Sequence, residues 1–251
     1  VTHLGTAPTA YKAMLSHPAL DEALKTLRHC ISAGEHLPEA TWRAWQDRTG
    51  IAITDGIGST EMMHIFVSAA GDAIRPGATG TAVPGYTATV LDPGGNPLDE
   101  GVGRLAVKGP TGCRYLDDPR QRDYVQNGWN VTGDTYRRDA DGYFWYLARS
   151  DDMIVSSGYN IGAPEVENAL LSHPAVAECA VIGVPCPERG QKVKAFVVLA
   201  GEAKASDALI AELQAHAKAE IAPYKYPREI EFVDTLPKTP TGKLRRSELR
   251  G

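Results

Sequence analysis

The sequence offers little that would support a metal centre, a disulfide framework or a membrane segment. Its four cysteines, Cys30, Cys113, Cys179 and Cys186, are scattered without a C-x-x-C pair, which favours reduced thiols in the cytoplasm. The seven histidines show no H-E-x-x-H or similar spacing, so a protein-held transition metal is not expected. No apolar run approaches the roughly 20 residues that cross a bilayer, and the first residues do not form a signal-peptide pattern. We therefore expect a cytoplasmic protein without a membrane partner.

The charge balance argues against a nucleic-acid partner. The chain carries 26 Lys and Arg against 31 Asp and Glu, a formal net charge of −5, whereas nucleic-acid-binding surfaces are usually strongly basic. Its 251 residues are 43% hydrophobic and 23% charged, which is ordinary for a globular protein with one large or two modest domains.

The stretch from Asn130 to Ile161 places an acid, a cation, a polar break and a tight glycine turn within a short span. An apolar run and a glycine leave Asp134 at a predicted strand end, where its carboxylate can accept two hydrogen bonds from a sugar diol. A hairpin turn is predicted at Asp141-Gly142. The returning strand delivers Arg149, a planar cation suited to hydroxyl or phosphate oxygens. Each feature alone is common in ordinary turns and on surfaces.

A polar break and a second tight turn follow. Asp151 lies in the S-D-D break after Arg149, and a short apolar run then leads to the small-residue turn around Ser157 and Gly158. A break between two strand-like segments is a place where a few backbone dihedrals can absorb a rotation.

A second signal follows a predicted strand at residues 51–54. The string D-G-I-G-S-T-E reads as a Gly-rich turn whose backbone N–H groups can face an anion. Thr60 can donate a hydrogen bond to a phosphate, and Glu61 can hold Mg²⁺ directly or through water. By itself a Gly-rich turn is usually no more than a turn.

The rest of the chain predicts mixed α/β structure followed by a small α+β module. Helical patterns cover residues 8–29, 38–50 and 164–171, and Ser206 is expected to cap another helix. Strands are expected at residues 27–32, 51–54, 86–91, 103–108, 176–184, 193–199 and 230–233. The tail P-K-T-P-T-G-K-L-R-R places Lys243 after a Pro/Gly-rich loop.

Together and in this order, the segments resemble the adenylate-forming superfamily of acyl- and aryl-CoA ligases, luciferases and peptide-synthetase adenylation domains. The string G-I-G-S-T-E-M-M-H-I-F resembles the G-x-T-E motif of the family, and is closest to its benzoate and aminobenzoate branch. The tail strongly resembles the closing motif P-K-T-x-T-G-K. Ile57 stands where the family often has an aromatic residue that stacks on adenine.

The resemblance implies a role for each segment. The catalytic residues are Lys243, Thr60 and Glu61, with Glu61 as the Mg²⁺ ligand. The nucleotide-binding residues are Gly34, Glu35, Asp55, Gly56, Ile57, Gly58, Ser59, Asp134 and Arg149. Ala33, His64 and Ile65 border the acyl pocket, Ser157, Gly158 and Tyr159 line the CoA channel, and Asp151 is the hinge.

The resemblance also implies the domain organisation. Residues 1–150 are expected to be the end of the large adenylation domain, with a β-rich subdomain at about 80–150, and residues 151–251 the small mobile domain. The family's phosphate loop, a Ser/Thr/Gly-rich segment ending in Pro-Lys-Gly, does not occur in the sequence. We therefore expect a C-terminal part whose missing N-terminal portion is a partner, and expect it to be inactive in adenylation alone.

The implied function is that of an ATP-dependent aryl-acid CoA ligase of the benzoate or 2-aminobenzoate type. The acid and ATP give acyl-AMP and pyrophosphate, and CoA then gives acyl-CoA and AMP, with Mg²⁺ required. A homodimer is a further expectation. The alternatives are another acid specificity, a peptide-synthetase adenylation domain, or a non-catalytic nucleotide-binding remnant.

Overall fold

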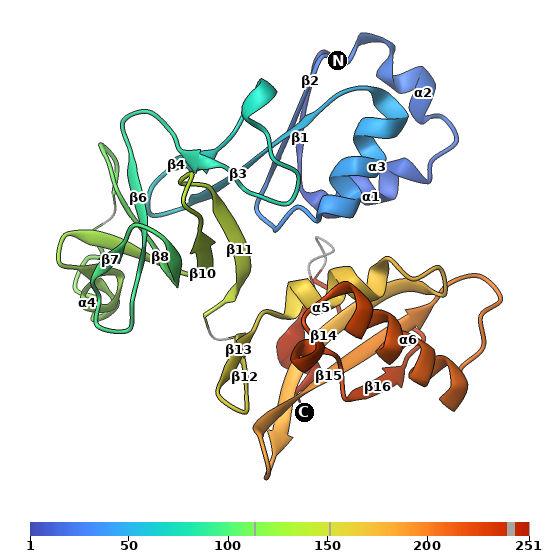
Figure 1. Ribbon diagram of the computed structural model, residues 1–251. Helices are drawn as coiled ribbons and strands as arrows, with labels where there is room; N and C mark the ends of the chain where they lie inside the picture. The colour runs from blue at the N-terminus through green and yellow to red at the C-terminus, as the bar shows by residue number, and fades with distance from the viewer. Residues whose placement is uncertain (113, 151, 240–243, 251) are drawn as a thin grey trace. The chain divides into compact units, whose positions relative to one another are not determined.

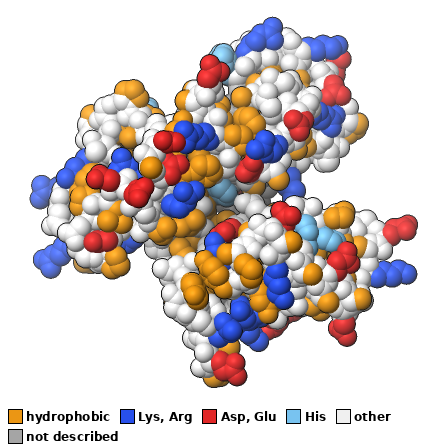
Figure 2. Space-filling view, in the orientation of Figure 1, with side chains coloured by type: hydrophobic (Ala, Val, Ile, Leu, Met, Phe, Trp, Pro, Cys, Tyr) orange, Lys and Arg blue, Asp and Glu red, His pale blue; other side chains and the backbone are white. Residues whose placement is uncertain are grey.

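The computed structural model describes residues 1–112, 114–150, 152–239 and 244–250 (Figure 1). The chain divides into two compact units, Val1–Tyr146 and Leu147–Gly251. On the face shown in Figure 2, acidic and basic side chains are interspersed over the surface. Within the described ranges, no helix has the length and apolar character needed to cross a membrane.

The first unit begins with a five-stranded sheet in the order β1-β2-β3-β4-β5. Strands β1 to β3 run parallel, and β4 and β5 are antiparallel to their neighbours. The strands are β1 (His3–Thr6), β2 (His29–Ala33), β3 (Ile53–Ser59), β4 (His64–Ser68) and β5 (Thr81–Ala82). The helices that connect β1, β2 and β3 are α1 (Pro8–Leu15), α2 (Leu20–Ala23), the 3₁₀ turn Leu24–Thr26 and α3 (Glu39–Thr49).

The helices of this part pack through two fully buried aromatic residues. Tyr11 of α1 meets Trp45 of α3 edge-to-face, with ring centroids 4.7 Å apart. The Tyr11 hydroxyl donates to the carbonyls of Leu4 and Ile31, at 3.1 and 3.0 Å, and so ties α1 to β1 and β2. The predicted helix end at Gly50 is confirmed, since Gly50 adopts the left-handed conformation with φ of 70°.

A second sheet forms the β-rich part of the first unit, in the order β11-β10-β8-β6-β7 with β9 on β10. Its core is shared with β4, because Phe66 and Val67 pack with Val90, Leu105 and Phe144. The elements are β6 (Thr87–Leu91), β7 (Pro97–Leu98), β8 (Gly101–Lys108), α4 (Arg120–Tyr124), β9 (Val125–Gln126), β10 (Trp129–Arg138) and β11 (Phe144–Arg149), with a 3₁₀ turn at Gly71–Ala73.

The predicted hairpin between β10 and β11 is confirmed, although its loop is longer than two residues. The loop closes through the Asp139 backbone N–H, which donates to the Tyr143 carbonyl at 3.0 Å, and Gly142 has a φ of 82°. The Asp139 carboxylate accepts from the backbone of Asp141 and Tyr143 and from the Trp145 indole, at 3.1, 2.9 and 2.8 Å. A single acid thus holds the whole turn.

The second unit is a small α+β module. Its sheet has the order β13-β12-β15-β14, with β16 parallel to β15. The predicted cap is confirmed, because Ser206 accepts from the Leu209 N–H at 3.2 Å. The elements are β12 (Ile154–Ser156), β13 (Tyr159–Ile161), α5 (Ala163–Leu171), β14 (Val176–Cys186), β15 (Gly190–Leu199), α6 (Asp207–Glu220) and β16 (Glu229–Phe232), with 3₁₀ turns at Pro223–Lys225 and Arg246–Leu249.

Candidate active site

Two of the sequence segments lie side by side at the ends of parallel strands. In the register of β2 and β3, Ser32 pairs with Asp55 and Ala33 with Gly56. The side chain of Ile65 in β4 lies directly over Gly56, within 2.8 Å of where a Cβ would stand. Because Gly56 has no side chain, the Ile65 side chain packs directly against the backbone of β3.

The sequence predicted a turn at the Gly-rich string, and this prediction is wrong. Residues 55–59 continue strand β3, and residues 56–59 pair antiparallel with β4, with a register irregularity between Ile57 and Gly58. Gly58 permits the pairing because a Cβ there would lie 2.5 Å from the His64 carbonyl oxygen. The turn instead spans the residues after Ser59, whose hydroxyl accepts from the Met62 N–H at 3.2 Å.

We predict that Gly58→Ala lowers the free energy of unfolding by roughly 1–3 kcal/mol, because the methyl group must push two backbones apart. Gly5→Ala in β1 is the matched control, since a Cβ there meets nothing within 4 Å. Urea unfolding of both variants checks this. Equal midpoints for the two variants would contradict the close approach.

Glu61 follows this turn and is held by a residue that the sequence analysis missed. The Tyr115 hydroxyl donates to Glu61 Oε1 at 2.6 Å. This hydrogen bond is the main reason that the pKa of Glu61 lies below its usual value. Thr60 is exposed beside it, and buried Met62 anchors the turn to the core. The turn therefore presents an ionised carboxylate next to an exposed hydroxyl.

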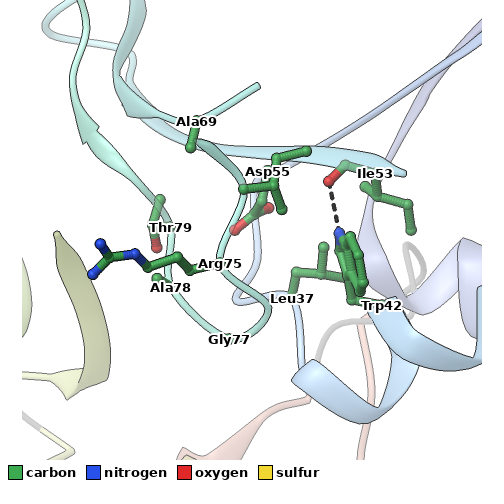
Figure 3. A pocket seen from close by; sticks show the side chains of 10 residues that line it. Leu37, Trp42, Ile53, Asp55, Ala69, Arg75, Gly77, Ala78 and Thr79 are labelled. Atoms are coloured by element: carbon green, nitrogen blue, oxygen red, sulfur yellow. Dashed lines mark hydrogen bonds between the residues drawn. The ribbon is translucent and has the colours of Figure 1, made fainter. Parts of the chain in front are cut away.

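Asp55 is the buried acid of the site. Its carboxylate is turned into a pocket that Trp42, Arg75 and Thr79 help to line, while the Trp42 indole donates to the Ile53 carbonyl at 2.9 Å (Figure 3). Burial raises the pKa of Asp55 to about 7, and the nearby Ser32 hydroxyl and Gly56 N–H offset this only in part. Its Oδ1 makes no hydrogen bond within the described part of the chain.

The segment after β2 contributes a left-handed glycine and a second missed residue. Gly34 has a φ of 88°, and Glu35 Oε2 accepts from the Thr9 hydroxyl at 2.6 Å. The His36 ring stacks on Tyr146, with centroids 5.1 Å apart. Burial lowers the pKa of His36 to about 4, so the imidazole is neutral at physiological pH. His36 is the residue that the sequence analysis missed, and its position directly after S-A-G-E was the signal that could have indicated it.

The sequence predicted that Asp134 lies at a strand end, and this prediction is wrong. β10 continues to Arg138, and its register against β8 shifts between Val131 and Thr135. This irregularity, rather than a strand end, removes Asp134 from the pairing with β8. Its N–H donates to Thr132 Oγ1 at 3.2 Å. Arg149 is exposed and is the last residue of β11, the strand next to β10.

The other predicted residues occupy separate places. His64 is exposed and stacks on Tyr86, with ring centroids 5.9 Å apart. Ser157 and Gly158 form the turn of the β12–β13 hairpin, with φ of 51° and 80°. Tyr159 is 53% exposed and stacks on Tyr224 at 4.3 Å. Asp151 and Lys243 lie outside the described residues.

Two family descriptions match the chain. "AMP-binding enzyme" matches residues 1–114, and "AMP-binding enzyme C-terminal domain" matches residues 165–243. The chain belongs to the adenylate-forming, AMP-binding enzyme family. The fold prediction of part of a large adenylation domain followed by a small α+β domain is confirmed as well.

Three relatives of this adenylate-forming chain are acyl-CoA synthetases or aryl-acid CoA ligases. The mitochondrial acyl-coenzyme A synthetase ACSM4 of Mus musculus is 44% identical over 100% of this chain and 45% of its own length. The benzoate–CoA ligase of Thauera aromatica is 45% identical over 97% of this chain and 47% of its own length. The crystal structure of the anthranilate CoA ligase AuaEII in complex with anthranoyl-AMP matches with a TM-score of 0.89 and 44% identity, covering 99% of this chain and 49% of that one.

The chain therefore spans about half the length of the relatives that it matches. Because the mouse relative is mitochondrial, the cytoplasmic location stays a prediction, as do the homodimer and the hinge at Asp151.

The site of this adenylate-forming chain fits a magnesium ion brought in by a nucleotide. Mg²⁺ is usually held by one or two carboxylates together with substrate phosphates, and Glu61 is a carboxylate kept ionised on an exposed turn. No cluster of three or more His, Cys, Asp or Glu side chains suited to a metal occurs among the described residues. A single carboxylate completed by phosphates matches this donor set.

Proposed function

We propose that this chain is part of an AMP-forming CoA ligase that acts on an aromatic carboxylic acid of the benzoate or 2-aminobenzoate type. The observation that carries the proposal is that the side chain of Ile65 fills the space directly over Gly56, next to the pair of Ala33 and Gly56. A site that an apolar side chain closes at this point suits a compact ring better than a long flexible chain. The benzoate–CoA ligase of Thauera aromatica and the anthranilate CoA ligase support the same class.

In the first half-reaction, a carboxylate oxygen of the acid attacks the α-phosphorus of ATP. The bond from the α-phosphorus to the bridging oxygen breaks, and pyrophosphate leaves with its electron pair. Asp134 accepts hydrogen bonds from the ribose hydroxyls, Arg149 supports the same sugar, and Thr60 donates to a phosphate oxygen. Mg²⁺, when bound, neutralises phosphate charge, and Glu61 is the residue that would hold it. Lys243 neutralises the charge that develops between carboxylate and phosphate.

In the second half-reaction, the CoA thiolate attacks the acyl carbon and the bond from that carbon to AMP breaks. The two attacks occur at different atoms from different directions, so they need differently lined sites. We assign the thiol's approach to the turn of Ser157, Gly158 and Tyr159. We assign to Asp151 the hinge about which the small domain rotates, so that one set of residues replaces the other at the site between the two half-reactions.

The substrate class is tested with the complete gene product. We expect kcat/KM for benzoate and 2-aminobenzoate to exceed that for long-chain fatty acids by roughly tenfold or more, a ratio that an apolar pocket can reach. The reverse order would refute the aromatic assignment and favour the alternative suggested by the acyl-coenzyme A synthetase of the mouse. The 251-residue chain alone is the control, and should show negligible acid-dependent ATP–pyrophosphate exchange because its sequence lacks the phosphate loop.

A further inference from the structure

Tyr115 makes a contact in the site that none of the sequence motifs required. Its hydroxyl donates to Glu61 Oε1 at 2.6 Å, and the two residues are 54 positions apart in the chain. A short hydrogen bond to a carboxylate is charge-assisted and directional. With one oxygen held in this way, the Glu61 carboxylate has a fixed orientation on a turn that is otherwise exposed.

The position of Tyr115 is itself fixed by the segment that follows it. Its backbone N–H donates to Gln121 Oε1 at 2.7 Å. The Arg120 guanidinium lies 4.8 Å from the centroid of the Tyr115 ring, and the Tyr124 ring meets it edge-to-face at 5.8 Å. The first and last residues of α4 therefore pack against the ring and leave the hydroxyl directed at Glu61.

The charge of Arg120 is compensated locally. Asp118 Oδ2 accepts from Arg120 Nε and Nη2, at 2.9 and 2.6 Å, and Asp118 Oδ1 accepts from the Arg120 backbone N–H at 2.9 Å. The strongest influence on Glu61 is therefore a neutral hydroxyl, and the Arg120 cation adds only a smaller attraction. A neutral donor orients a carboxylate without cancelling its charge, and therefore leaves it able to attract a divalent cation.

We propose that Tyr115 is a positioning residue that orients Glu61 toward the magnesium ion of the bound nucleotide. This rests on the proposed function for the identity of the nucleotide complex, and on the described contacts for the role of the hydroxyl. Its loss weakens the affinity for the metal and leaves the chemical step intact once the metal is saturating.

The test compares Tyr115→Phe with Tyr143→Phe in the complete gene product. Tyr143→Phe removes a hydroxyl of the same kind that does not contact Glu61. That hydroxyl donates to the Ala73 carbonyl at 2.8 Å. We expect Tyr115→Phe to bind Mn²⁺ in the presence of ATP about tenfold more weakly than the parent, the effect of losing one hydrogen bond to a charged group. Electron paramagnetic resonance of free Mn²⁺ measures this without turnover, and Tyr143→Phe should match the parent.

A kinetic arm separates positioning from general damage. Excess Mg²⁺ should restore kcat of Tyr115→Phe to within about twofold of the parent, whereas Glu61→Gln should stay impaired. Parent-like Mn²⁺ binding by Tyr115→Phe overturns the proposal. So does a loss of kcat that persists at saturating Mg²⁺ together with a lowered Tm, because that pattern marks a structural role.

Failure of the proposed function gives a different pattern. A parent protein that forms no acyl adenylate with any acid refutes the function, and the Mn²⁺ comparison alone then decides the role of Tyr115. A parent protein that binds no Mn²⁺ in the presence of ATP overturns the role of Tyr115 itself.

Discussion

Lys243→Ala is expected to slow acyl-adenylate formation by about 10²–10³-fold in the complete gene product, the usual effect of losing one electrostatic stabiliser. Thioester formation from preformed acyl adenylate and CoA should stay near the parent rate. The reason is that the ammonium group acts on charge that develops only while the carboxylate attacks the α-phosphate. Single-turnover kinetics measure each step separately.

The described residues on either side of this lysine are held by several contacts. Lys238 forms an antiparallel bridge with Leu244, and the Arg245 N–H donates to the Pro237 carbonyl at 2.9 Å. Arg246 Nη2 donates to both carboxylate oxygens of Glu167, at 2.7 and 2.8 Å. Leu236 and Leu244 pack on the cluster that contains Ala180, Ile182 and Phe196.

The matched control for Lys243→Ala is Lys204→Ala, which removes an exposed lysine from the turn between β15 and α6. It should leave both half-reactions at the parent rate. If Lys243→Ala slowed thioester formation as much as adenylation, the same residues would serve both half-reactions. The proposed domain rotation at Asp151 would then be wrong.

Asp55→Asn is expected to stabilise the 251-residue chain at pH 8 by up to roughly 4 kcal/mol. The pKa of Asp55 rises on folding from 3.8 to about 7 because its carboxylate is buried, and that difference corresponds to roughly 4 kcal/mol. The ionised form therefore costs free energy in the folded state, and a neutral amide of the same shape avoids that cost.

The pH dependence has a defined sign. Because the pKa is higher in the folded state, the contribution of Asp55 to stability is fully present below about pH 4 and is lost as the pH rises to about 7. Urea unfolding at pH 4 to 8 should show Asp55→Asn and the parent converging at the acid end. Asp72→Asn, at an exposed position, is the control. A stability difference that does not change with pH would contradict the assignment.

Much of the fold followed from local patterns. Gly50 ends α3, Ser206 caps α6 and Asp141-Gly142 lies in the β10–β11 hairpin, since each depends on residues within one turn of the chain. The order of the motifs indicated the family. The family resemblance in turn predicted which segments, far apart in the sequence, come together.

What local patterns could not predict was the approach of one backbone to another. The string after Ile53 has the composition of a turn, yet Gly56 and Gly58 serve as the places where β4 and its side chains come close. Asp134 is left out of the pairing with β8 by a register shift that depends on the position of β8 itself. The hydroxyl of Tyr115 reaches Glu61 across 54 positions, and no spacing rule links two residues so far apart.

The central claim is that the activated intermediate is an acyl adenylate, and isotope transfer tests it most directly. The complete gene product is incubated with benzoate labelled with ¹⁸O at both carboxylate oxygens, ATP, CoA and Mg²⁺, and the nucleotide product is analysed by mass spectrometry. Attack of the carboxylate on the α-phosphorus predicts AMP that carries one ¹⁸O atom for each benzoyl-CoA formed. Label found in inorganic phosphate, or unlabelled AMP formed alongside labelled thioester, would contradict the account.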